Sequence, residues 1–111
     1  MRSFAMILNL KDDSKAIEEY KEYHSAVWPE VLEGLKSTGI SKMRIFLRGT
    51  QLFMYLEAED DFDLGRDFER YMSSDRAKQW DALMREYQEP VPGAGPDEWW
   101  APMEEVFDLH A

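Results

Sequence analysis

The first third of the chain changes from a continuous apolar run to helical spacing. The run Phe4–Leu10, bounded by charged residues, predicts a buried strand. Across residues 15–27 the apolar positions recur every three or four residues, which predicts an amphipathic helix. Pro29 has no backbone N–H donor and fixes its own φ. The first helix is therefore expected to stop before Trp28, and a second to run from Pro29 to about Ser37.

The middle of the chain has the two-residue periodicity of side chains that is typical of β-strands. Residues 43–48 alternate along a strand pattern, and residues 51–57 continue in strand-forming residues after Gly49. A β-hairpin that turns at Gly49 is the expected structure. Gly39, just before the hairpin, is a natural stop for the preceding helix.

The last part of the chain predicts two more helices, a loop and a final strand. The acidic run Glu59–Asp61 would cap a third helix that ends near Ser73–Ser74, and Asp75 would cap a fourth. Proline and glycine dominate residues 89–96, which predicts a loop long enough to cover a site. Met103–Leu109 is a candidate last strand.

This order of elements predicts an α+β fold. Strand, helix, strand, strand, helix, strand is the split βαβ, or ferredoxin-like, pattern, and the length of 111 residues fits a single domain over residues 1–111. Helices on one face of such a sheet leave its other face uncovered. We expect a partner subunit or a ligand to cover that face, which apolar side chains could line: Met6, Phe46, Phe53 and Tyr55.

Charge and composition limit the classes of partner that we expect. The formal net charge of -10 would repel a phosphate backbone or an anionic membrane surface, so we expect neither nucleic acid nor membrane as a partner. The chain has no cysteine, which fits a reducing compartment. No apolar run is long enough to cross a bilayer, and the first ten residues do not form a signal sequence. We therefore expect a cytoplasmic protein.

Candidate chemistry centres on Tyr20 and His24. The two residues are one helical turn apart and share a face, so a phenol and an imidazole would point into the same space. An imidazole titrates near neutral pH and can serve as acid or base for proton transfer on a small hydroxylated molecule. The spacing alone is more typical of two ordinary helix residues that pack or hydrogen-bond locally.

Other candidates each have a structural alternative. Trp80 could stack on the C–H face of a sugar or belong to the core, and Asp81 could accept hydrogen bonds from sugar hydroxyls or be a solvated helix charge. Trp99 and Trp100 could anchor the preceding loop over a site or lie in a subunit interface. The acidic clusters lack the spacing of a calcium site and abut helix starts, so we expect no metal.

The chain resembles the L-rhamnose mutarotase family, small enzymes that interconvert the anomers of a deoxy sugar. The resemblance spans nearly the whole sequence. It rests on Tyr20, His24 and Trp28-Pro29-Glu30, on Gly39, Ile45-Phe46-Leu47, Leu52-Phe53-Met54 and Glu57, and on Ser74-Asp75, Trp80, Met84 and Glu105-Val106-Phe107.

The resemblance implies a function and a site. It implies a mutarotase without a cofactor, an isomerase whose proposed acid/base catalyst matches His24 and whose sugar-contacting tyrosine matches Tyr20. It also implies a homodimer in which two sheets pair into a dimeric α/β barrel. Where the rhamnose enzymes have a tyrosine this chain has Met43, and where they have paired tryptophans it has Trp80 and Asp81. These differences would change which sugar hydroxyls are matched.

Several short segments favour one branch of the family. Lys11–Asp13, Asp60–Asp63 and Val91–Ala94 with Met103 look more like the L-fucose mutarotases, so L-fucose is expected ahead of L-rhamnose. Two other functions stay open because a fold does not fix a function. They are a cofactor-independent oxygenase or haem-handling protein of the same barrel class, and a non-catalytic dimerisation domain.

Overall fold

A five-stranded antiparallel sheet forms one layer of the molecule. The computed structural model describes residues 1–110. Its strands run in the order β2-β3-β1-β4, with β5 paired to a second stretch of the outer edge of β1. The bounds are β1 (Arg2–Leu10), β2 (Ile40–Arg48), β3 (Gln51–Ala58), β4 (Gln88–Glu89) and β5 (Ala101–Pro102). This order and the helices between the strands confirm the predicted α+β, ferredoxin-like fold class.

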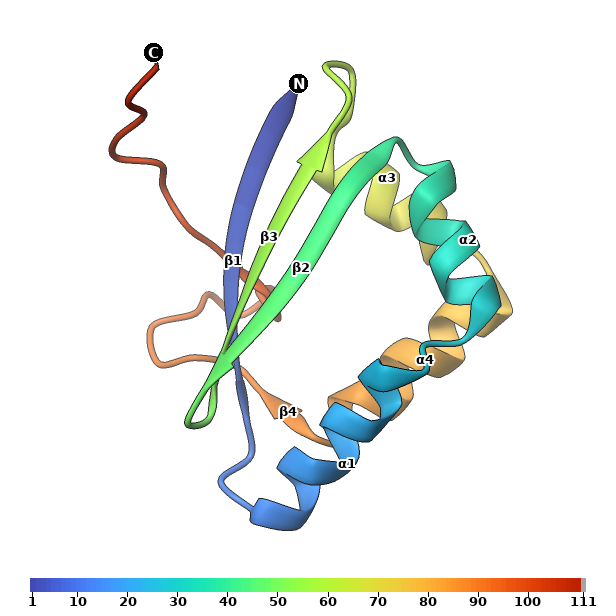
Figure 1. Ribbon diagram of the computed structural model, residues 1–111, viewed down its shortest axis with the longest axis vertical. Coiled ribbons are helices and arrows are strands. Elements are labelled where there is room, and N and C mark those ends of the chain that lie inside the picture. The colour runs from blue at the N-terminus through green and yellow to red at the C-terminus, as the bar shows by residue number, and fades with distance from the viewer. Residues whose placement is uncertain (111) are drawn as a thin grey trace.

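Four helices within residues 1–110 form the second layer, on one side of the sheet (Figure 1). They are α1 (Ser14–Ser25), α2 (Pro29–Ser37), α3 (Leu64–Tyr71) and α4 (Asp75–Arg85). None of these helices is long and apolar enough to span a membrane.

Local chemistry explains where the helices begin and end. The Asp13 carboxylate accepts a hydrogen bond from the Lys15 backbone N–H at 3.1 Å and caps α1, while Pro29 is the first residue of α2, as the sequence predicts. Gly39 has a φ of +97°, a left-handed conformation that suits glycine after a helix. The predicted caps of α3 and α4 were wrong. Asp63 caps α3 in place of the acidic run Glu59–Asp61, and Ser74 in place of Asp75 caps α4.

The alternation of β1 and β3 separates a covered sheet face from an open one. Met6, Leu8 and Leu10 are buried under the helices together with Leu52, Met54 and Leu56 of β3. The prediction that Met6 lies on the uncovered face is therefore wrong: its cross-strand partner is Met54, also on the helical side.

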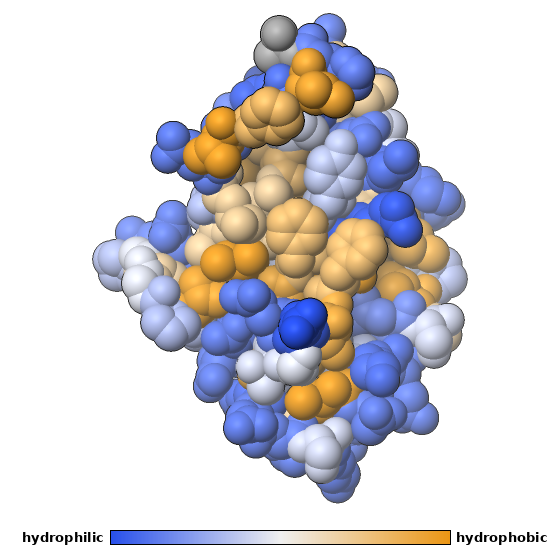
Figure 2. Space-filling model, turned by 60° about the vertical axis from the view of Figure 1, so that its left-hand side comes forward, coloured by the Kyte–Doolittle hydropathy of each residue, from blue (hydrophilic) through white to orange (hydrophobic). Residues whose placement is uncertain are grey.

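The open face is apolar at its centre, as predicted for Phe46, Phe53 and Tyr55. Phe46 pairs with Phe53 across β2 and β3, their ring centroids are 6.2 Å apart, and Phe46 is 48% exposed. Ile7 lies opposite Phe53 on β1. Figure 2 shows apolar side chains gathered in the middle of the molecule on this side, with hydrophilic side chains around them.

The predicted last strand, Met103–Leu109, does not form. The Met103 backbone N–H still donates to the Ala5 carbonyl at 2.8 Å, and the chain then leaves the sheet without further strand pairing through residue 110. Within residues 97–110, only Ala101 and Pro102 form strand pairs with β1. Val106 and Phe107 have high strand propensity, but in one copy of the chain they find no neighbouring strand and remain 87% and 75% exposed.

Candidate active site

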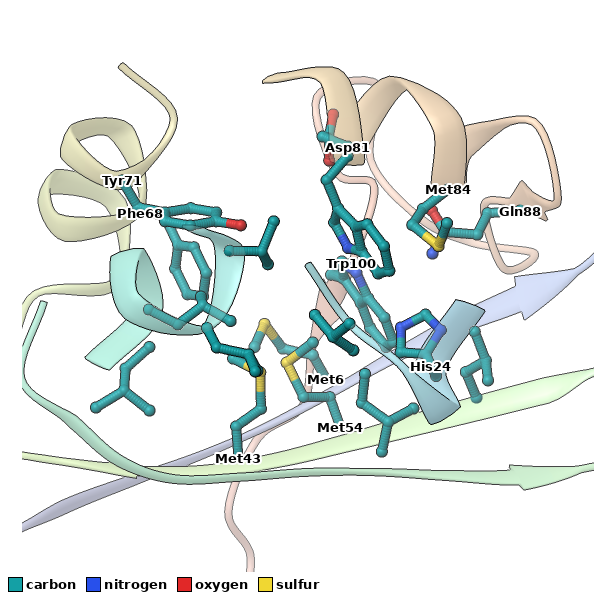
Figure 3. Close-up of a pocket in the computed structure, with 18 of the residues that line it drawn as sticks. Met6, His24, Met43, Met54, Phe68, Tyr71, Asp81, Met84, Gln88 and Trp100 are labelled. Atoms are coloured by element: carbon teal, nitrogen blue, oxygen red, sulfur yellow. The ribbon is translucent and has the colours of Figure 1, made fainter. Parts of the chain in front are cut away.

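A cavity of about 980 Å³ lies between the sheet and the helices (Figure 3). Its volume falls in the range of small-molecule sites, which is roughly 300–1,000 Å³. The three long strands and the four helices all contribute to its wall, which is mostly apolar. Five of the seven methionines of the chain line it: Met6, Met43, Met54, Met72 and Met84. The cavity brings together all five residues that the sequence singled out: Tyr20, His24, Met43, Trp80 and Asp81.

His24 sits in the last turn of α1, where its ring faces the cavity. Its Nδ1 lies 2.9 Å from the backbone carbonyl oxygen of Tyr20. Because a carbonyl can only accept, Nδ1 must carry the proton, and the neutral ring then presents an unprotonated Nε2. Burial lowers the pKa of His24 below its usual 6.5, which the hydrogen bond to the Tyr20 carbonyl partly offsets. The imidazole is therefore a neutral base at pH 7.

Tyr20 packs directly against this imidazole. The two ring centroids are 4.2 Å apart, and Tyr20 is only 4% exposed. Its hydroxyl lies 3.5 Å from the side-chain nitrogen of Gln88. Burial raises the pKa of Tyr20 to about 12, even though the hydrogen bond with Gln88 acts in the opposite direction. The phenol therefore keeps its proton throughout the neutral range.

Trp80 belongs both to the core and to the cavity wall. It is a buried member of the cluster beneath α1 and α4, and its ring makes edge contacts with His24 and Trp28 at centroid distances of 5.5 Å and 5.1 Å. Tyr23 approaches it from a third direction at 6.1 Å. The two alternatives for Trp80, a core residue or a residue of the site, are thus compatible. One indole packs against the His24 ring and also lines the cavity.

Asp81 and Met43 lie on different elements of the wall. Asp81, on α4, accepts a hydrogen bond from Arg85 Nε at 2.8 Å, an ion pair at the surface. Met43 projects from β2 toward the apolar part of the cavity, and Phe68 and Tyr71 of α3 lie on that same side (Figure 3). Burial and the negative charge of Asp81 raise the pKa of Tyr71 to about 12.

Sequence reasoning missed several cavity residues. Gln88 is buried and contacts Tyr20, although it lies in a two-residue strand with no motif around it. Trp100 lines the cavity beside His24, whereas Trp99 donates a hydrogen bond to Gln88 and lies under Arg85. The tryptophan pair thus joins the end of the proline- and glycine-rich loop to Gln88, to α4 and to the cavity wall. The two adjacent tryptophans are the sequence signal that could have identified these residues.

Within residues 1–110, no group of three or more histidine, aspartate and glutamate side chains is arranged to hold a metal ion. The polar groups of the cavity come instead from several elements. Tyr20 and His24 lie on α1, Tyr71 on α3 and Gln88 on β4, and charged side chains also line the wall: Lys21, Lys36, Lys42, Asp81 and Asp97. Such a set can exchange protons with, and hydrogen-bond to, a small polyhydroxylated ligand.

The sequence matches the family model for L-rhamnose mutarotase over residues 3–109. The chain belongs to the L-rhamnose mutarotase family. This membership confirms the resemblance seen in the sequence, and with it the enzyme class, an isomerase that acts on carbohydrates.

Individual proteins are similar to this chain along almost its whole length. The chain is 50% identical to a UPF0734 protein of Dictyostelium discoideum, over 97% of this chain and 90% of the relative. It is 34% identical to an L-fucose mutarotase of Xanthomonas campestris pv. campestris, over 98% and 89% of the two chains. The solved L-rhamnose mutarotase of Formosa agariphila superposes with a TM-score of 0.70 at 26% identity, over 98% and 99% of the two chains.

Proposed function

We propose that this protein interconverts the α and β anomers of a 6-deoxy-L-hexose, with His24 as the acid/base catalyst. The observation that supports this proposal is the state of His24: a partly buried, neutral imidazole whose Nδ1–H is held by the Tyr20 carbonyl, so that Nε2 is available in a cavity that can admit a sugar. Family membership supplies the reaction class, and the geometry supplies a group able to carry it out.

The chemistry needs one proton to move between two oxygens. His24 Nε2 takes the proton of the anomeric hydroxyl while the bond between C1 and the ring oxygen breaks, which gives the open-chain aldehyde. The imidazolium then returns that proton to the former ring oxygen. Because both oxygens start on C1, one imidazole can reach each in turn. Rotation about C1–C2 followed by the reverse steps gives the other anomer.

The neighbouring side chains would hold the sugar for this exchange. Tyr20 would hydrogen-bond a sugar oxygen, and Trp80 would pack against the C–H face of the ring. Asp81 at the rim and Met43 on β2 would decide which hydroxyl pattern fits, because they differ from the tyrosine and tryptophan of the rhamnose enzymes. No cofactor is needed for these steps.

We favour L-fucose as the substrate over L-rhamnose. The two sugars differ in configuration at C2 and C4. The loss of one hydroxyl-bearing side chain from the cavity wall therefore changes the hydrogen bonding available to one sugar hydroxyl. The support comes from Met43 and Asp81, together with the relationship to an L-fucose mutarotase along almost the whole chain.

The proposal is tested by saturation-transfer NMR on the anomeric protons of L-fucose and L-rhamnose. Irradiation of one anomer should reduce the signal of the other far beyond the spontaneous rate, most strongly for L-fucose. The absence of acceleration for both sugars would contradict the proposed reaction. Acceleration for L-rhamnose alone would contradict the proposed substrate and leave the reaction in place.

We further propose that the protein is a homodimer joined through the open sheet face. This face exposes Phe46 beside Phe53 in the middle of the sheet (Figure 2), and the segment that follows β5 exposes Val106 and Phe107. An uncovered apolar patch of this kind marks an interaction surface, and a second copy offers a self-complementary partner for it. Sedimentation equilibrium should give twice the chain mass, and Phe46→Asp should shift the protein toward the monomer. A wild-type monomer at micromolar concentration would contradict the dimer.

A further inference from the structure

Gln88 lies between Tyr20 and Trp99 and is hydrogen-bonded to both. Its side chain is buried, with the residue only 5% exposed. The Trp99 indole N–H donates to Gln88 Oε1 at 2.8 Å, and Gln88 Nε2 lies 3.5 Å from the Tyr20 hydroxyl oxygen. The three residues come from α1, β4 and the segment before β5. Tyr20 and Gln88 line the cavity, and Tyr20 packs against His24.

The chemistry of the three groups fixes the direction of both hydrogen bonds. An indole N–H can only donate, so Gln88 must turn its carbonyl oxygen toward Trp99. Its amide N–H₂ then faces Tyr20, and the phenol oxygen accepts. The phenol proton is left to donate elsewhere, and within residues 1–110 no other side chain or backbone group hydrogen-bonds this hydroxyl. Tyr20 lines the cavity, so a ligand bound there can offer this proton an acceptor.

We propose that Gln88, oriented by Trp99, is a positioning residue that fixes the Tyr20 hydroxyl as a hydrogen-bond donor to an oxygen of the substrate. The inference rests on the proposed mutarotase function and extends it. His24 Nε2 presents an acceptor and Tyr20 a donor at the same end of the cavity. One acceptor and one donor match the two oxygens of an anomeric centre, a hydroxyl that gives up a proton and an ether oxygen that receives one.

The rest of the structure holds Trp99 in place. Arg85 lies over its indole ring, with the guanidinium carbon 4.4 Å from the centroid, and the same guanidinium pairs with Asp81 at 2.8 Å. Helix α4 thus ties down the end of the proline- and glycine-rich loop. Burial, which raises the pKa of Tyr20 to about 12, keeps the proton on the phenol that donates it.

The decisive variant is Gln88→Glu. A carboxylate still accepts from Trp99 but also accepts from Tyr20, so the phenol proton turns away from the cavity. The kcat/KM for anomer exchange should fall by about 10- to 100-fold, the usual cost of leaving a buried hydrogen-bonding group wrongly paired. Gln51→Glu, at an exposed position of the hairpin, makes the same chemical change and should retain wild-type activity.

Gln88→Met separates positioning from simple packing. Methionine has a similar size and no hydrogen bonds, so it disturbs the core at least as much but leaves the phenol free to donate. It should lose about fivefold or less in kcat/KM, even if its Tm falls further than that of Gln88→Glu. Activity that follows Tm across the two variants would overturn the proposal, because a merely structural role predicts that order.

A double-mutant cycle with Tyr20→Phe tests whether Gln88 acts through Tyr20. In the Tyr20→Phe background, Gln88→Glu should cost almost nothing further, whereas additive losses would overturn the proposal. The ¹³Cζ resonance of labelled Tyr20 gives a readout without substrate. It should move downfield in Gln88→Glu as the phenol begins to donate to the carboxylate, and an unchanged resonance would contradict the assigned direction.

Failure of the two proposals can be told apart. A wild-type protein that exchanges no sugar anomers overturns the mutarotase function, while the Tyr20 resonance still tests the direction of the hydrogen bonds. An active wild type with an equally active Gln88→Glu variant overturns the positioning role alone.

Discussion

The two ends of the cavity differ in how their side chains are held. At one end His24, Tyr20 and Gln88 are hydrogen-bonded to fixed partners, and their donors and acceptors have defined directions. At the other end Met43 and Phe68 line the wall through apolar contact alone (Figure 3). Proton transfer needs groups held in one geometry, whereas an apolar, methionine-rich wall adapts to different shapes. We therefore propose that the His24 end carries out the reaction and that the Met43 end selects the substrate.

The strongest way to break this comparison is to replace His24. Asparagine keeps a donor near the position of Nδ1, so His24→Asn can still bond the Tyr20 carbonyl but has no base at Nε2. Anomer exchange should fall by at least about 100-fold, the usual contribution of general acid/base catalysis.

The matched control is His110→Asn, which changes the other histidine, exposed near the chain end. It should exchange anomers at the wild-type rate. If His24→Asn kept more than a tenth of wild-type activity in the same NMR assay, the proposal that the reaction takes place at the His24 end of the cavity would be wrong.

A substitution at the Met43 end of the cavity should change the preference between the two sugars rather than the ability to exchange anomers. Met43→Tyr adds a hydroxyl to the cavity wall at the position where the sequence resemblance implies a tyrosine in the rhamnose enzymes. The ratio of kcat/KM for L-rhamnose to that for L-fucose should therefore rise by about tenfold. The ratio comes from exchange rates of both sugars at several concentrations.

Met103→Tyr makes the same substitution on the exposed segment that follows β5. It should leave the ratio unchanged. A Met43→Tyr variant that slows both sugars equally would show that this wall does not choose between them.

Asp81 at the rim should have a smaller effect. Its carboxylate is partly exposed and already paired with Arg85, so Asp81→Asn removes a charge but keeps a hydrogen-bonding side chain. We expect a loss of about three- to fivefold in kcat/KM, mainly through KM, with Asp12→Asn as an exposed control. An effect on kcat as large as that of His24→Asn would mean that Asp81 takes part in proton transfer.

The smallest expected effect is on stability. Burial lowers the pKa of His24 in the folded protein, so between that pKa and 6.5 the unfolded chain binds more protons than the folded one. Stability should therefore decline as pH falls below 6.5 and level off below the folded pKa. Urea unfolding at pH 7 and pH 5 measures this decline, which should be smaller in His24→Asn. Equal declines in both proteins would contradict the lowered pKa.

Local signals in the sequence predicted much of this arrangement. Pro29 separates α1 from α2, Gly49 turns the hairpin, and the i, i+4 spacing of Tyr20 and His24 places both at the cavity. Each of these depends on chemistry within a few residues of the position, which a single sequence contains.

The remaining features depend on contacts between distant parts of the chain. Gln88 contacts Tyr20, which lies 68 positions away in the sequence, and no local pattern around Gln88 predicts this contact. Val106 has strong strand propensity but no strand beside it, because the outer edge of β1 pairs only with the two short strands β4 and β5. Propensity gives a tendency, and the neighbours decide the outcome.

The central claim is that neutral His24, with its proton on Nδ1 and its Nε2 free, performs the chemistry. The most direct test records the ¹⁵N resonances of the His24 ring and the kcat/KM for L-fucose over the same pH range. We predict Nδ1–H at neutral pH, and a rate that falls in acid with the same midpoint, below 6.5, at which the ring protonates. A rate that does not change while His24 becomes protonated, or a ring with its proton on Nε2, would contradict the account.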